Sequence, residues 1–109
     1  SMVALGAVDK NSIFVTGPEQ GRAGQIVPHK HMLDNVHEVC GTGTLFPDEK
    51  GDSVLHMHMA CGRGDSTITG CIRNGVRVWH IMEVIISELV KSSGVRKKDP
   101  ATGFDLLSP

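Results

Sequence analysis

The segment from Val54 to Cys61 alternates between two kinds of side chain, and this alternation limits the possible fold more than any other feature of the sequence. Every second residue is apolar, and histidines occupy positions 56 and 58 between them. The apolar set is Leu55, Met57, Met59 and Cys61. Because successive side chains of a β-strand point to opposite faces of a sheet, we predict a strand whose Met-rich face packs in the core and whose other face carries both histidines.

A second strand is predicted from Ser66 to Arg73, after the turn-forming stretch Gly62-Arg63-Gly64-Asp65. Two loops are compatible with this stretch: one of two residues, Arg63 and Gly64, and one of all four. Both loops give the same register. The sequence therefore predicts a single β-hairpin with one arrangement of its facing side chains.

In that register His56 lies opposite Cys71, and His58 lies opposite Thr69. Directly opposed side chains have Cβ atoms about 5 Å apart. Imidazole and thiolate suit zinc, and three protein ligands with an open fourth position are typical of catalytic rather than structural zinc sites. The alternative is that the histidines are polar surface residues and that Cys71 is a small buried hydrophobe.

The rest of the chain also shows mostly period-two patterns interrupted by turn residues, which favours strands joined by short loops. Strands are predicted at Ile13–Val15 and Val36–Phe46, and Glu19–Gln25 is expected to be a loop. Val76–Leu89 begins as a strand, and its later part could bend or become helical. The tail from Lys91 to Pro109 is interpreted as a loop with at most one short edge strand.

Composition and charge narrow the class of protein. The chain has 109 residues, of which 39% are hydrophobic and 21% charged, as expected for one globular domain. Ser1 and Met2 are interpreted as a cloning scar and start, and residues 3–109 as the domain. No apolar run is long enough to span a bilayer. Three cysteines and no leader-like segment predict a cytoplasmic location.

Several motifs together resemble the plants-and-prokaryotes-conserved (PPC) domain family in its stand-alone prokaryotic form. They are the run Leu55-His-Met-His-Met-Ala-Cys-Gly-Arg-Gly-Asp, then Thr69-Gly-Cys-Ile-Arg, then Glu83-Val-Ile-Ile. Glu38 in His37-Glu-Val resembles an acidic position of the family. The resemblance extends from about Val3 through Leu107.

This resemblance implies an α+β fold, with a mostly antiparallel β-sheet and few helices, in a compact single domain that assembles through its sheet as a homotrimer. It also implies zinc binding by three histidines. His56 and His58 occupy the first two positions, and Cys71 stands where the family has its third histidine. Family members usually begin with a strand and a helix before the segment that resembles Val3–Val8. Without them, we expect a partner subunit to cover the sheet.

DNA binding is implied by the resemblance alone, because family members are sometimes labelled AT-hook-associated DNA-binding domains. Gly62-Arg63-Gly64 lacks the flanking arginine and proline of an AT-hook. The formal net charge is −1, so the chain has no overall attraction for phosphate backbones. The one basic cluster, Arg96-Lys97-Lys98, is followed by Asp99 and is interpreted as a solvated loop.

The sequence favours an oligomeric binding or regulatory module with a zinc site. The alternative is a metal-dependent enzyme that acts on a small polar substrate at a subunit cleft. Glu83, Glu38 or His80 could act as a general base or orient a histidine ligand. In a regular strand His80 and Glu83 would face opposite sides, so without a bulge only one of them could face the site. Arg73 could instead hold an anionic ligand. Of the two hypotheses, we favour the binding or regulatory module.

Other reactive or aromatic residues have simpler interpretations. Cys40 and Cys61 are predicted to be inert core thiols, and Trp79 to lie in the core or at a subunit interface. His29, His31 and His37 lie near loops and do not predict a second metal site.

Overall fold

The protein, described by a computed structural model at residues 1–21 and 26–109, is built from antiparallel β-strands. The expected loop at Glu19–Gln25 falls partly outside the described residues. Nine strands are present in that part of the chain: β1 (Met2–Val8), β2 (Ile13–Pro18), β3 (Pro28–Met32), β4 (His37–Pro47), β5 (Ser53–Arg63), β6 (Ser66–Ile72), β7 (Val78–Ile86), β8 (Val95–Lys98) and β9 (Asp105–Ser108).

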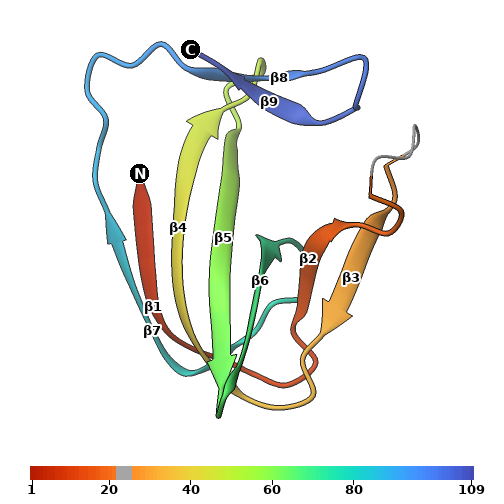
Figure 1. Ribbon diagram of the computed structural model, residues 1–109. Coiled ribbons are helices and arrows are strands. Elements are labelled where there is room, and N and C mark those ends of the chain that lie inside the picture. The colour runs from red at the N-terminus through yellow and green to blue at the C-terminus, as the bar shows by residue number, and fades with distance from the viewer. Residues whose placement is uncertain (22–25) are drawn as a thin grey trace.

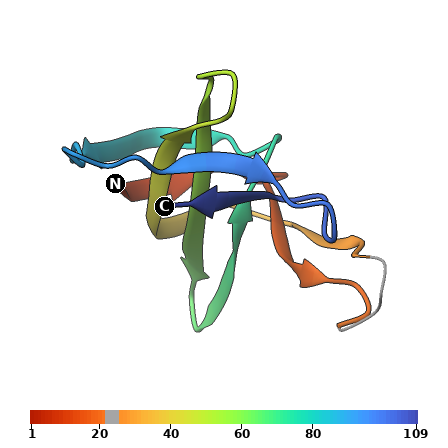
Figure 2. The same ribbon diagram turned by 90° about the horizontal axis from the view of Figure 1, so that it is seen from above.

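Seven of the strands form one twisted sheet in the order β3-β2-β6-β5-β4-β1-β7, and β8 and β9 pair as a separate hairpin. Figure 1 shows β4 and β5 in the middle of the sheet, and Figure 2 shows the β8–β9 hairpin crossing one end of it. The described residues contain no helix, so the expected α+β class is wrong and the fold is all-β. No helix that could cross a membrane occurs among these residues.

The later part of Val76–Leu89, for which a bend or a helix was considered, stays extended as far as Ile86 because of its composition and its partner. Val84, Ile85 and Ile86 are β-branched residues, which fit a pleated surface better than a helix. They pair with Ala4, Val3 and Met2 of β1. The strand ends at Ile86. The tail differs too, because it forms a two-stranded hairpin rather than a loop with one edge strand.

The core lies on one face of the large sheet, which we call the inner face. Phe14, Leu33, Val8 and Cys61 are fully buried there, with Met57 and Met59 beside them. This confirms the Met-rich face of the alternating segment as the core side. Leu55 is 40% exposed, contrary to expectation, because it lies near the beginning of β5.

Two glycines of β4 let β5 approach closely behind the histidines. Gly41 pairs with Met59 and Gly43 with Met57. A Cβ atom added at Gly43 would lie 2.7 Å from the carbonyl oxygen of His56 and 2.7 Å from Cβ of Met57. The absence of side chains at Gly41 and Gly43 therefore allows β5 to pack closely against β4.

We expect Gly43→Ala to lower the free energy of unfolding by about 1–3 kcal/mol, because the added methyl group overpacks a close contact between two strands. Gly62→Ala is the matched control. Its nearest neighbour would be the Thr67 hydroxyl at 3.6 Å, an ordinary contact. Urea denaturation of both variants tests this, and equal stabilities would contradict it.

Candidate metal centre

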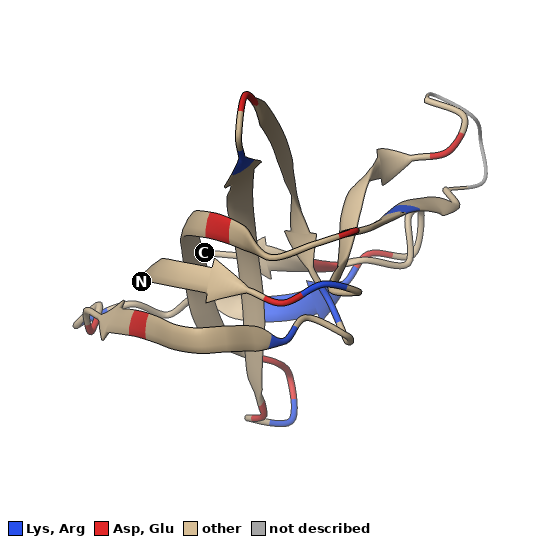
Figure 3. Ribbon diagram, turned by 90° about the horizontal axis from the view of Figure 1, so that it is seen from below, with Lys and Arg blue, Asp and Glu red and all other residues tan. Residues whose placement is uncertain are grey.

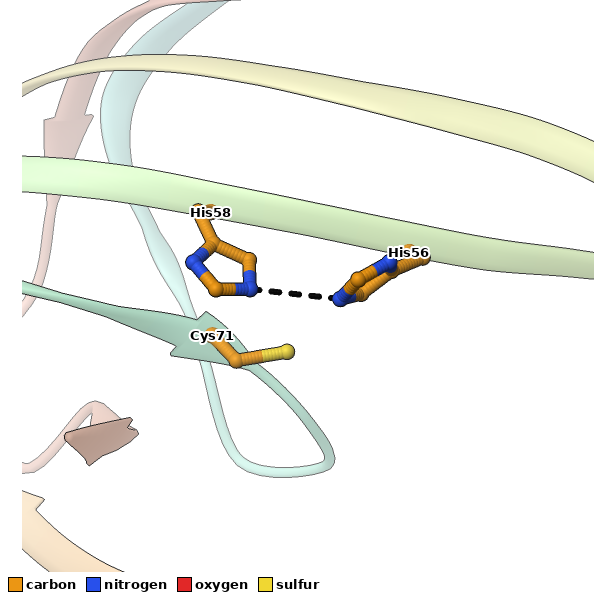
Figure 4. A group of neighbouring side chains, drawn as sticks. All are labelled: His56, His58 and Cys71. Atoms are coloured by element: carbon orange, nitrogen blue, oxygen red, sulfur yellow. Dashed lines mark hydrogen bonds between the residues drawn. The ribbon is translucent and has the colours of Figure 1, made fainter. Parts of the chain in front are cut away.

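Three side chains that can bind a metal ion meet on the outer face of the sheet, opposite the core. His56 and His58 come from β5, and Cys71 comes from β6. Their possible ligand atoms all lie within 4.8 Å of one another. Figure 4 shows both imidazole rings and the thiol directed toward a shared space. The structure therefore brings together the three residues that the sequence singled out.

The hairpin register differs from the predicted one by two residues. His58, not His56, lies opposite Cys71, and Ala60 lies opposite Thr69. The cause is the turn, whose two central residues are Gly64 and Asp65. Gly64 has φ 56°, and a positive φ at the first central residue alone is typical of a type II′ turn with glycine there.

A shift of two residues preserves the face on which each side chain lies, whereas a shift of one would have moved every side chain to the other face. Cys71 is thus directly across from His58 and diagonal to His56, which is still within reach of a long side chain. The predicted cluster forms although its predicted register was wrong.

The spacing of the two imidazole nitrogens fits a tetrahedral ion. Metal–nitrogen bonds of about 2.0–2.1 Å place two nitrogen ligands about 3.3 Å apart in tetrahedral geometry. The Nε2 atoms of His56 and His58 are 3.2 Å apart. At this distance one neutral imidazole can also donate a hydrogen bond to the other. The donor set of two imidazoles and one thiol suits zinc or a similarly soft ion.

Burial and nearby cations both favour the neutral form of His56 by lowering its pKa. Partial burial lowers the pKa of His56, and the positive charges of His58, Arg96 and Arg73 lower it further. Neutral imidazole is the form that binds a metal. Every charged group that acts on this pKa is a cation, so the site has a positive environment before any ion is added.

The three cysteines differ in exposure and reactivity. Cys71 is buried, and its thiol donates to the carbonyl oxygen of Ile72 at 3.6 Å. Cys61 is in the core, and burial raises its thiol pKa to about 11, which agrees with an inert core thiol. Cys40 is exposed, so its predicted place in the core is wrong. It lies on the outer face because β4 turns alternate residues outward.

Glu38, Glu83 and His80 lie together in a hollow elsewhere on the sheet. β7 is separated from β5 by β4 and β1, three strand spacings or roughly 14 Å. A β-bulge interrupts the pairing of β1 with β7, and His80 within it has φ 55°. The bulge places His80 and Glu83 in one hollow, which a regular strand would prevent.

Trp79 lies in the same hollow and is exposed, so it is not a core residue. Its ring meets that of His80 edge to face, with centroids 4.3 Å apart. Of the remaining histidines, His29 shares a hydrogen bond of 2.7 Å with the Thr16 hydroxyl, and His37 bonds the carbonyl oxygen of Asn35 at 2.9 Å.

Two arginines lie near the cluster, and only Arg73 was predicted from the sequence as a possible ligand-binding residue. Arg73 follows directly after β6, and the hairpin register continued by two residue pairs would set it across from His56. Arg96, interpreted as part of a solvated loop, is on β8 and only 6% exposed. Its burial depends on a contact with Thr44 of β4, 52 positions earlier in the chain, which the local sequence does not reveal.

Comparison with known proteins agrees with this architecture. Residues 1–90 match the sequence profile of the Plants and Prokaryotes Conserved (PCC) domain. The chain belongs to this family, which is the PPC family suggested by its motifs. No curated protein matches the chain.

One solved structure with a similar fold is the crystal structure of a metal-containing protein from Archaeoglobus fulgidus. It superposes with a TM-score of 0.78 at 18% sequence identity, over 99% of this chain and 72% of that one. At this identity the likeness shows a shared fold.

We expect one thiol of the native protein to react fast with an aromatic disulfide reagent at pH 8. That thiol is Cys40, because it is exposed, whereas Cys61 and Cys71 are buried and a thiol must ionise to react. Cys40→Ser should abolish the fast phase, and Cys61→Ser should leave it unchanged. A fast phase that survives in Cys40→Ser would contradict this assignment.

Proposed function

We propose that this PCC-domain protein is an oligomeric binding or regulatory module that holds a zinc ion with His56, His58 and Cys71. The observation that carries the proposal is the meeting of three ligand atoms within 4.8 Å on one hairpin. The metal-containing description of the Archaeoglobus fulgidus protein, which shares the fold, supports it. A bound zinc ion would leave one tetrahedral position for a ligand from outside the chain.

The cysteine makes zinc the favoured ion. A thiolate is a softer ligand than imidazole and selects zinc over magnesium, calcium or manganese. Because Cys71 is paired in register with His58, the two ligands come from adjacent strands of a rigid hairpin. The hairpin therefore preorganises the site and limits the entropy lost when the ion binds.

Assembly through the sheet, as a homotrimer, is part of this proposal. β7 forms one edge of the large sheet, and the chain from Val84 to Val90 exposes five large apolar side chains. These are Val84, Ile85, Ile86, Leu89 and Val90, each 48–74% exposed. An exposed apolar edge strand is a surface on which another chain packs. We propose that a second copy covers it.

Direct binding to duplex DNA is not part of the proposal. The net charge is −1, and acidic and basic segments are interspersed around the fold (Figure 3). Of the single basic cluster, Arg96 is buried, which leaves Lys97 and Lys98 on the surface. This arrangement offers few contacts for a phosphate backbone.

A metal-dependent enzyme acting on a small polar substrate is the second candidate function. It is favoured by the open fourth position that three protein ligands leave on a tetrahedral ion. Glu38, Glu83 and His80, the candidates for a general base, lie in the separate hollow beside β7. A reaction at this metal would therefore need a base from the substrate or from another subunit.

Near-stoichiometric zinc is expected in untagged protein purified without a chelator, measured by elemental mass spectrometry. His56→Ala and Cys71→Ala should lose most of it, since each removes one of three ligands. Cobalt substitution should give thiolate-to-cobalt absorption in the near ultraviolet that Cys71→Ala lacks. His31→Ala and Cys40→Ala are matched controls that should retain the metal. Unchanged zinc in both ligand variants would refute the site.

In analytical ultracentrifugation at micromolar concentration, we expect a mass near three times 11.7 kDa. Ile85→Lys should shift the protein to the monomer, because it would bury an unpaired charge in the interface. Met32→Lys, equally exposed but on β3 at the opposite edge, should leave the assembly intact. A wild-type monomer would rule the assembly out.

A further inference from the structure

The C-terminal hairpin places a buried guanidinium group beside the candidate metal centre. Arg96 reaches from β8 to β4, where its Nη2 donates to the Thr44 hydroxyl at 2.9 Å. Its Nη1 donates to the carbonyl oxygen of Asp105 at 3.2 Å. Both acceptors are uncharged. Nε is buried with no hydrogen-bond partner, so the charge of this side chain is poorly compensated.

The register of the sheet puts this charge at the edge of the cluster. Thr44, which accepts from Arg96, pairs directly with His56 across β4 and β5. Arg73, directly after β6, would lie across from His56 if the β5–β6 register continued. The two arginines approach from different elements, β8 and the end of β6. The candidate metal ligands are therefore flanked by two guanidinium groups, each from a different element.

This grouping of positive charges destabilises the folded protein unless an anion balances it. Burying a cation without a countercharge opposes folding. A divalent ion would add further positive charge, and the single thiolate of Cys71 cannot balance it together with two guanidinium groups. The missing component of the site is therefore negative charge from outside the cluster.

The chemistry of the donors indicates the class of ligand. A guanidinium group presents planar N–H donors that match the oxygens of carboxylates and phosphates. Zinc also accepts a carboxylate oxygen at about 2.0–2.2 Å. One oxyanion could therefore satisfy both the metal and an arginine. Arg73 is exposed and can contact the ligand directly, whereas buried Arg96 acts through its charge.

We infer that the ligand of this site is a small oxyanion, a carboxylate or a phosphate, which fills the open metal position and is selected by Arg73 and Arg96. This inference rests on the proposed metal site. It adds that the β8–β9 hairpin, which lies beyond the residues that match the family profile, contributes to ligand selection. Arg73 is a ligand-binding residue, and Arg96 is a positioning residue.

The inference can be tested on the cobalt-loaded full chain, by titration with inorganic phosphate and with acetate at constant ionic strength. Anion binding is read from the visible absorption of cobalt, and cobalt content is measured separately. We expect both anions to change the spectrum, with affinity about tenfold lower in Arg73→Gln and in Arg96→Met. Lys97→Gln, next to Arg96 on β8 but on the opposite face, should bind like the wild type.

The other possible outcomes overturn either the inference alone or the proposed metal site as well. Stoichiometric cobalt with no spectral response to either anion, or with responses unchanged in the arginine variants, overturns the inference and leaves the metal site standing. Failure to bind cobalt overturns the proposed function, and the inference with it. If Arg96→Met does not fold, as judged by circular dichroism, Arg73→Gln decides the question, since Arg73 is exposed and outside the core.

Discussion

The antiparallel pairing of β5 with β4 on one side and β6 on the other is the constraint on which the structure depends. β5 turns Met57, Met59 and Cys61 toward the core and His56 and His58 away from it. The same backbone hydrogen bonds therefore fix the core and the candidate site. The core and the candidate site are therefore coupled, because they occupy the two faces of one strand.

The faces of this strand could be predicted from the sequence because they depend only on the alternation of side chains. The register depended on which residue of Gly62-Arg63-Gly64-Asp65 takes a positive φ, and two glycines were available. Gly64 has this conformation, which moved the pairing by two residues. The cluster was still correctly anticipated, since an even shift returns His58 and Cys71 to the same face.

Features that depend on contacts between distant segments were harder to predict. The helices implied by family resemblance are absent from the described residues, and Val84–Ile86 stays in the sheet because β1 is available as its partner. Arg96 was misassigned because its burial requires contact with Thr44, 52 positions earlier in the chain. A local pattern of basic residues contains no information about such a contact.

The bulge in β7 limits how the sheets of two copies of this protein can join. Regular pairing with β1 covers Met82–Ile86, and Trp79–Ile81 depart from it. Irregular backbone twists an edge and interrupts its rows of donors and acceptors. Only the short regular segment can accept a strand from another chain in register. The edge therefore resists the continuous strand stacking of fibres and favours contacts of limited length.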